Sequence, residues 1–70
     1  MDMPKEAFEK LIDEQFEGNQ NQCARSLDLA PSTVCRIVNG TGKPGIKAIT
    51  NVMKYCYEKD INYAKYINLS

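Results

Sequence analysis

The 70-residue chain contains no histidine and no tryptophan, and its cysteines stand far apart at Cys23, Cys35 and Cys56. No Cys-x-x-Cys spacing occurs, which excludes the usual zinc arrangements. An odd number of cysteines without a paired framework indicates reduced thiols. The loop 41–45 is rich in glycine but does not have the Walker spacing. With no histidine and no carboxylate pair near a predicted cleft, we expect neither an enzyme nor a metal or cofactor site.

Long apolar runs are also missing, so the sequence predicts no membrane span and no membrane partner. The first residues carry no basic segment of the kind that precedes a secretory leader. Together with reduced cysteines, these features predict a cytoplasmic protein of a bacterium or a phage-infected cell. The length is that of one small domain, 1–70, with a modest core that association into a dimer would stabilise.

The net charge is zero, but the charges are unevenly distributed. Residues 1–17 carry six acidic and two basic side chains, whereas residues 18–54 carry five basic side chains and one acidic one. A surface that faces phosphate needs local rather than global positive charge. The sequence therefore places a basic surface on the middle of the chain and the acidic first helix away from it. An ordinary solvated face would give the same split, so charge alone leaves that alternative open.

Helical periodicity accounts for almost the whole chain and predicts an all-α fold, a compact bundle of four to five short helices. The first helix is predicted over 4–17, with Pro4 in its first turn and the pair 18–19 at its end. A later helix is predicted over 46–58, and Asp60 is predicted to cap a short fifth helix. A strand is the alternative for that tail, because tyrosine and isoleucine also favour strands. The predicted core positions of these three segments are Ala7, Phe8, Leu11, Ile12, Phe16, Ile46, Ile49, Val52, Met53, Cys56, Ile61, Ala64 and Ile67.

Residues 20–40 have a helical spacing that is interrupted once and then resumes. Asn19 or Asn21 is predicted to cap a helix that runs to about residue 27, and a turn follows at 28–30. Pro31 opens the next helix, which ends near residue 38 before the pair 39–40. The apolar positions of the two helices and their turn are Cys23, Ala24, Leu27, Leu29, Val34, Ile37 and Val38. This pattern is typical of two short helices packed at a steep angle, the arrangement of a helix-turn-helix.

The segment resembles the helix-turn-helix of the lambda repressor-like family, which includes phage repressors, Cro proteins and Xre-type regulators. Gln20 matches the glutamine that often opens the motif, and the pair 39–40 matches its frequent Asn-Gly end. The segment 31–34 followed by Arg36 also resembles the recognition helix of the lac repressor family. Asp28 replaces the usual turn glycine, and Ala30 stands where a capping serine or threonine is common. The structural positions that match are Ala24, Leu27, Leu29, Val34 and Ile37.

The resemblance implies a DNA-reading role for the exposed positions at the start of the helix 31–38 and one turn later. These positions are Pro31, Ser32 and Arg36. The guanidinium of Arg36 matches guanine O6 and N7, Ser32 discriminates weakly, and Pro31 offers only an apolar contact with a thymine methyl. The alternatives for Arg36 are a phosphate contact or simple solvation. Cys35 is expected to pack near the groove, with a redox role as a lesser alternative.

Contacts with the DNA backbone are expected on both sides of that helix. Gln20 and Gln22 begin the preceding helix, where backbone amides suit an anion, and the alternative is simple capping or solvation. Thr33 faces either a phosphate or a base. The segment after the helix would hold the opposite strand. The full set of expected backbone-contacting residues is Gln20, Gln22, Thr33, Asn39, Thr41, Lys43 and Lys47.

One such unit contacts few base pairs, so tight binding requires two units on a symmetric double-stranded site. The tail over about 55–70 is rich in tyrosine, and we expect Tyr63, Tyr66 and Ile67 to form a homodimer interface. The alternative is that these side chains only cover the core. The sequence thus predicts a transcriptional regulator, a repressor that binds a palindromic operator as a dimer. The competing hypothesis is an antitoxin-type interaction module that uses the same fold, and the acidic face of 2–17, to hold a partner protein.

Overall fold

The computed structural model describes residues 2–68, which form four α-helices and no strand. The helices are α1 (Lys5–Phe16), α2 (Gln20–Ser26), α3 (Pro31–Asn39) and α4 (Ile46–Glu58). A single 3₁₀ turn, η1 (Tyr63–Lys65), follows α4. The predicted all-α class is confirmed, and the helix boundaries lie within one or two residues of those expected from periodicity and capping.

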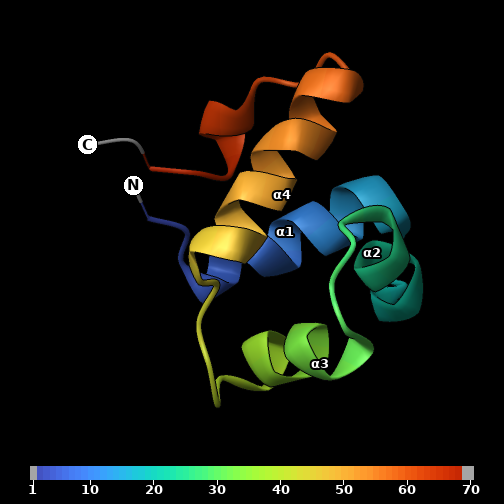
Figure 1. Ribbon diagram of the computed structural model, residues 1–70, viewed down its shortest axis with the longest axis vertical. Helices are drawn as coiled ribbons and strands as arrows, with labels where there is room; N and C mark the ends of the chain where they lie inside the picture. The colour runs from blue at the N-terminus through green and yellow to red at the C-terminus, as the bar shows by residue number, and fades with distance from the viewer. Residues whose placement is uncertain (1, 69–70) are drawn as a thin grey trace.

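The helices are arranged around α1, which crosses the middle of the molecule (Figure 1). Helices α2 and α3 pack on each other and on α1, while α4 is followed by η1, which returns along it. Helix α3 lies at one end of the molecule, on the side of the N-terminal end of α4 (Figure 1). The two ends of the described chain lie side by side, because Asp2 and Asn68 exchange backbone hydrogen bonds of 2.8 and 2.7 Å.

The core is built mainly from the predicted stripes. Residues Phe8, Leu11, Ile12 and Phe16 of α1 are buried, and the ring of Phe16 lies 5.2 Å from that of Tyr55 on α4. This part of the prediction is confirmed. The sequence analysis missed Met3 and Pro44, which are buried although both lie outside the helices. Neither position belongs to a periodic segment, so no helical pattern could reveal it.

One predicted core position of α4 is wrong. Ile46 is 78% exposed, and Met53 is only half-buried, whereas Ile49, Val52 and Cys56 are buried as expected. The buried arc also includes Ala48, at 4% exposure, which turns the core-facing side of the helix away from Ile46.

The predicted fifth helix is reduced to the three-residue turn η1, and Asn62 caps it instead of Asp60. The Asn62 side chain accepts a hydrogen bond of 3.0 Å from the amide of Ala64. Asp60 instead adopts a left-handed backbone conformation with φ of 59° and ends α4. The strand alternative is also not observed in the described tail, apart from the isolated bridge at Asn68. The last two residues of the tail, 69–70, lie outside the described residues.

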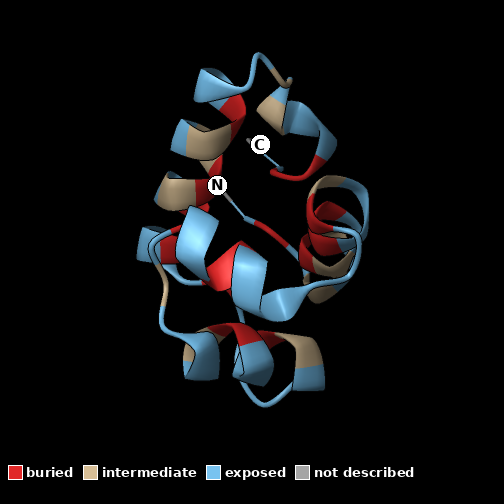
Figure 2. Cartoon of the chain, turned by 90° about the vertical axis from the view of Figure 1, so that its right-hand side faces the viewer, coloured by how far each residue is buried: buried red, intermediate tan, exposed pale blue. Residues whose placement is uncertain are grey.

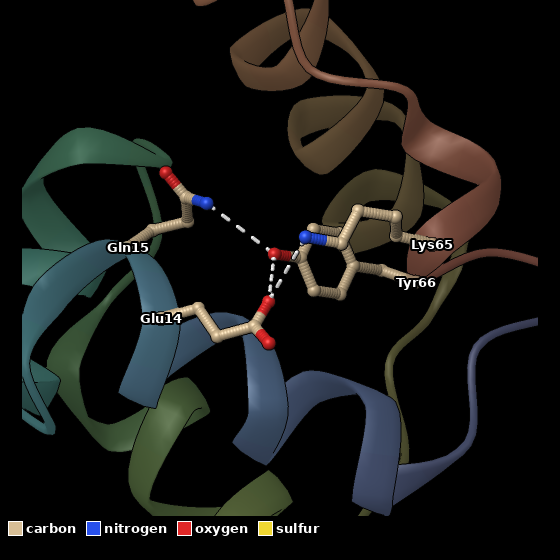
Figure 3. Close-up of polar contacts among 4 residues, drawn as sticks. All are labelled: Glu14, Gln15, Lys65 and Tyr66. Atoms are coloured by element: carbon tan, nitrogen blue, oxygen red, sulfur yellow. Dashed lines mark hydrogen bonds and ion pairs between the residues drawn. The ribbon is translucent and has the colours of Figure 1, made fainter.

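A polar cluster ties the tail to α1 (Figure 3). The buried Tyr66 donates a hydrogen bond of 2.6 Å from its hydroxyl to Oε1 of Glu14, and Gln15 Nε2 donates to the same hydroxyl at 3.3 Å. Lys65 Nζ lies 3.4 Å from Oε1 of Glu14. The hydrogen bond from Tyr66, followed by the interactions with Lys65, lowers the pKa of the Glu14 carboxyl below its ordinary 4.5. Burial, followed by the same hydrogen bond to Glu14, raises the pKa of Tyr66.

This cluster predicts an acid-dependent loss of stability. A carboxyl group whose pKa is lowered by folding stabilises the protein above its ordinary pKa, and this contribution disappears as pH falls through the lowered value. We expect Tyr66→Phe to reduce the difference in free energy of unfolding between pH 7 and acid, measured by urea denaturation across the range below about 5. Tyr63→Phe is the matched control, because no hydrogen bond of its hydroxyl occurs within residues 2–68. An equal effect of both variants would contradict the assignment.

Candidate nucleic-acid interface

The backbone between α2 and α3 is fixed by hydrogen bonds at the end of α2. The amide of Leu29 donates to the carbonyl of Ala24 at 2.8 Å, and the amide of Asp28 donates to Arg25 at 3.3 Å. Asp28 has φ of 54°, the left-handed conformation that this pair of bonds requires. The aspartate therefore occupies the position that glycine fills most easily, as the sequence predicted. The chain then reverses and enters α3 at Pro31.

Apolar contacts hold the two helices together behind this turn. Cys23 and Ala24 of α2 are buried, as are Leu27 in the turn and Val34 and Ile37 of α3. Their exposed fractions are 2% or less. The small side chain of Ala24 allows the two helices to approach each other, and α2 packs on α3. Leu29 and Val38 are half-buried against the same core.

Asn51, in the middle of α4, also supports the turn. Its Nδ2 donates a hydrogen bond of 2.8 Å to the carbonyl of Leu27. This bond satisfies a carbonyl at the C-terminal end of α2 and links the helix pair to α4. The sequence analysis did not select Asn51. The only available signal was an amide side chain inside a helix, a position where asparagine is disfavoured unless it finds a partner.

The outer side of α3 is exposed along its length (Figure 2). Cys35 and Arg36 follow Ser32 by three and four residues, and Asn39 follows them by four and three. The four residues therefore share one face of the helix, and all are exposed. Pro31 is exposed at the first position of α3. The structure therefore brings the three predicted base-contacting residues, Pro31, Ser32 and Arg36, to one accessible surface.

Arg36 combines an anchored backbone with an uncommitted side chain. Its carbonyl accepts hydrogen bonds from the amide of Thr41 at 3.0 Å and from Oγ1 of Thr41 at 3.3 Å. Within residues 2–68 its guanidinium forms no ion pair. A guanidinium with five donors and no acidic neighbour is available to a bidentate acceptor such as a phosphate or a guanine edge.

The predicted backbone-contacting residues before and within α3 differ in their accessibility. Gln20 and Gln22 are exposed at the start of α2, but the amide of Gln22 already donates to Oδ1 of Asn19 at 3.0 Å. This hydrogen bond confirms Asn19 as the N-cap of α2. It also leaves one backbone amide fewer at the start of the helix to bind an anion. Thr33 is half-buried on the flank of α3, so it is the least accessible of the set.

The remaining predicted residues belong to the last position of α3, the following loop and the first turn of α4. Asn39 is exposed and donates from Nδ2 to Sγ of Cys35 at 3.3 Å. Lys43 and Lys47 are exposed, and neither forms an ion pair in the described part of the chain. A shallow hollow joins the loop 40–43 to Asp2 and Lys5, which the sequence analysis did not associate with this surface. Acidic Asp2 therefore lies beside the basic loop.

Two of the three predicted dimer-interface residues are not on the surface. Tyr66 and Ile67 are each 2% exposed, and Tyr63 is half-buried. They pack against the core of their own chain, which corresponds to the alternative that the tail covers the core. The assignment of Tyr66 and Ile67 to a dimer interface is therefore wrong, because a side chain already enclosed by its own fold offers no area to a second copy.

The cysteines differ in accessibility. Cys23 and Cys56 are buried and Cys35 is exposed, and all three are free thiols. Burial raises the pKa of the Cys23 thiol to about 12 and raises that of Cys56 as well. Among residues 2–68, no group of three histidine, cysteine or acidic side chains is placed to hold a metal ion. No helix in the same part of the chain is long and apolar enough to cross a membrane.

Comparison of the chain with models of protein families, with curated proteins and with solved structures gives no match. The functional argument therefore depends on the geometry of this chain.

The conformation of the turn can be tested, because the left-handed backbone of Asp28 costs conformational free energy that glycine in the same conformation would not. We expect Asp28→Gly to raise the free energy of unfolding by about 1 kcal/mol, since glycine adopts positive φ without steric penalty. The melting temperature, measured by circular dichroism, should then rise by about 4–8 °C. Lys10→Gly, at an exposed position inside α1, is the control and should lower stability by roughly 0.5–1 kcal/mol. A lower melting temperature for Asp28→Gly would show that the turn is built differently.

Thiol reactivity tests the exposure of α3. Titration of the native protein with a disulfide reagent at about pH 8 should modify Cys35 rapidly, while Cys23 and Cys56 react only after unfolding, because burial keeps them protonated. Cys35→Ser should abolish the rapid phase. Rapid reaction of a second thiol in that variant would mean that the core is more open than described.

Proposed function

We propose that this chain is a sequence-specific DNA-binding regulator of phage or bacterial type. In this proposal, α2, the turn and α3 act as a helix-turn-helix, and α3 enters the major groove of double-stranded DNA. The regulator binds a palindromic operator as a dimer and represses by occupying it. The observation that carries the proposal is that Pro31, Ser32 and Arg36 share the exposed side of α3, while the opposite side is anchored in the core.

Shape supports this proposal. A helix enters the major groove only if it projects from the body of the protein, and α3 lies at one end of the molecule with its outer side uncovered (Figures 1 and 2). The hydrogen bonds at Leu29 and Asn51 fix its inclination relative to α2 and α4. Such support holds the side chains of a recognition helix in one register against the bases.

Charge supports it as well. The exposed cations Arg36, Lys43 and Lys47 belong to α3, the following loop and the first turn of α4. Phosphate neutralisation by such residues contributes most of the sequence-independent affinity of DNA-binding proteins. Asp2, beside the loop 40–43, opposes this effect at one edge. We therefore expect moderate affinity from a single copy, with a strong dependence on salt.

Selection of bound sequences from a random pool of duplex DNA is the first experiment. The proposal predicts an enriched palindrome, whose binding constant falls as a power of salt concentration yet stays above that of random DNA by a factor of about 10³ or more. An interaction module of the antitoxin type without DNA-reading activity would enrich no sequence. That result would contradict the proposal.

Arg36 provides the sharpest test of base recognition. Arg36→Ala should relax the preference for one guanine in each half-site, with a loss of about 1–3 kcal/mol of discrimination. Arg25→Ala is the matched control, because Arg25 is an exposed cation on α2 and not on α3. Binding constants for the selected site and for single-base variants would separate the two effects. A uniform loss across all sequences would make Arg36 a phosphate contact.

A further inference from the structure

The two large apolar side chains that are most exposed in the described chain both belong to α4. Ile46 is 78% exposed and Tyr57 is 86% exposed. Thr50 and Met53 lie between them, exposed and half-buried, at successive spacings of four, three and four residues. At 100° per residue the four positions fall within an arc of about 60°. We call this set the α4 stripe.

The surroundings of the α4 stripe resemble an interface more than an ordinary solvated surface. A shallow apolar hollow is lined by Thr50, Met53 and Tyr57 together with Tyr63 from η1, and the charged residues Lys54 and Glu58 also border it. An apolar centre bordered by charged side chains is the usual composition of a protein–protein contact.

Most of the α4 stripe lies outside the core of the single chain, although Met53 packs against that core. The core is contacted by another side of α4, through Ala48, Ile49, Val52 and Cys56. Ile46 and Tyr57 lie at opposite ends of the helix and away from that side. Burying them therefore stabilises an assembly rather than the isolated domain.

We propose that a second copy of this chain covers the α4 stripe, with the two α4 helices parallel about a two-fold axis that runs along them. Each stripe residue then faces its own equivalent, as a two-fold interface requires. Alternating spacings of four and three residues are those of a two-helix seam, in which side chains of one helix fit between those of the other. This surface replaces the buried residues Tyr66 and Ile67 as the dimer contact.

The position of α3 favours the parallel arrangement, an argument that rests on the proposed function. Helix α3 lies on the side of the N-terminal end of α4 in both views of the molecule (Figures 1 and 2). A two-fold axis along α4 places both α3 helices at the same end of the dimer, where one DNA duplex can contact them. An antiparallel pairing would place them at opposite ends and allow only one to contact a given duplex.

The available area limits the strength of this dimer. Helix α4 has 13 residues and is about 20 Å long, so a single-helix seam buries less than the roughly 1,200 Å² of stable complexes. We expect a dissociation constant of about 1 μM to 1 mM in solution. Two weakly associating copies would bind a palindrome cooperatively, because DNA holds them at high effective concentration.

Sedimentation equilibrium of the full chain, without DNA and at up to about 1 mM, tests the interface independently of DNA binding. The wild type should dimerise, Tyr57→Ser and Ile46→Ser should each weaken dimerisation tenfold or more, and Lys10→Ser should change it less than threefold. Lys10 is an exposed residue of α1 that does not line the hollow, and circular dichroism would verify that all variants fold. A wild type that stays monomeric, or a Tyr57→Ser variant that dimerises normally, would overturn the proposal.

Disulfide trapping tests the orientation. In a Cys35→Ser background, Tyr57→Cys alone should form a linked dimer on mild oxidation, because parallel pairing places position 57 beside its equivalent. Linkage only between Tyr57→Cys and Ile46→Cys chains would indicate antiparallel pairing and overturn the proposed geometry.

On DNA, Tyr57→Ser should bind an isolated half-site as the wild type does but lose cooperativity on the palindrome. If the chain dimerises but selects no DNA sequence, the proposed function is contradicted, and with it the argument for the parallel orientation. The proposal that the α4 stripe is the dimer interface would still hold.

Discussion

The junction between α2 and α3 is the constraint on which the rest of this structure depends. Leu27 is buried there, and its carbonyl accepts a hydrogen bond from Nδ2 of Asn51. Asp28 turns the chain with positive φ. These three features fix where α3 begins and which of its sides faces the core. Helix α3 has only nine residues, so helix propensity alone would not hold it in position without these contacts.

The two sides of α3 therefore have separate roles. Val34 and Ile37 anchor the helix and are fully enclosed, so they determine stability. Within residues 2–68 the side chains of Ser32 and Arg36 form no hydrogen bond or ion pair, and the bond from Asn39 to Cys35 lies within α3. A surface held rigidly from behind, with polar side chains free in front, suits recognition of a ligand whose own shape is regular, and duplex DNA has that property.

Local features of the sequence predicted most of the fold. Periodicity and capping gave the four helices, since Asn19, Pro31 and Gly40 act within a few residues of their own positions. The exposure of Ser32 and Arg36 followed from the same spacing. Contacts between distant segments could not be predicted: the bond from Asn51 to Leu27 and that from Tyr66 to Glu14 join residues 24 and 52 positions apart. The exposure of Ile46 depends on how α4 is rotated against α1, which a single helical pattern does not determine.

The most direct test of the central claim is a nuclear magnetic resonance titration of the folded chain with a selected duplex. Binding through α3 predicts that backbone amide shifts change most over residues 31–47, with smaller changes at the start of α2 and little change on the acidic outer side of α1. Changes centred on α1, or an absence of change with every duplex, would contradict the account.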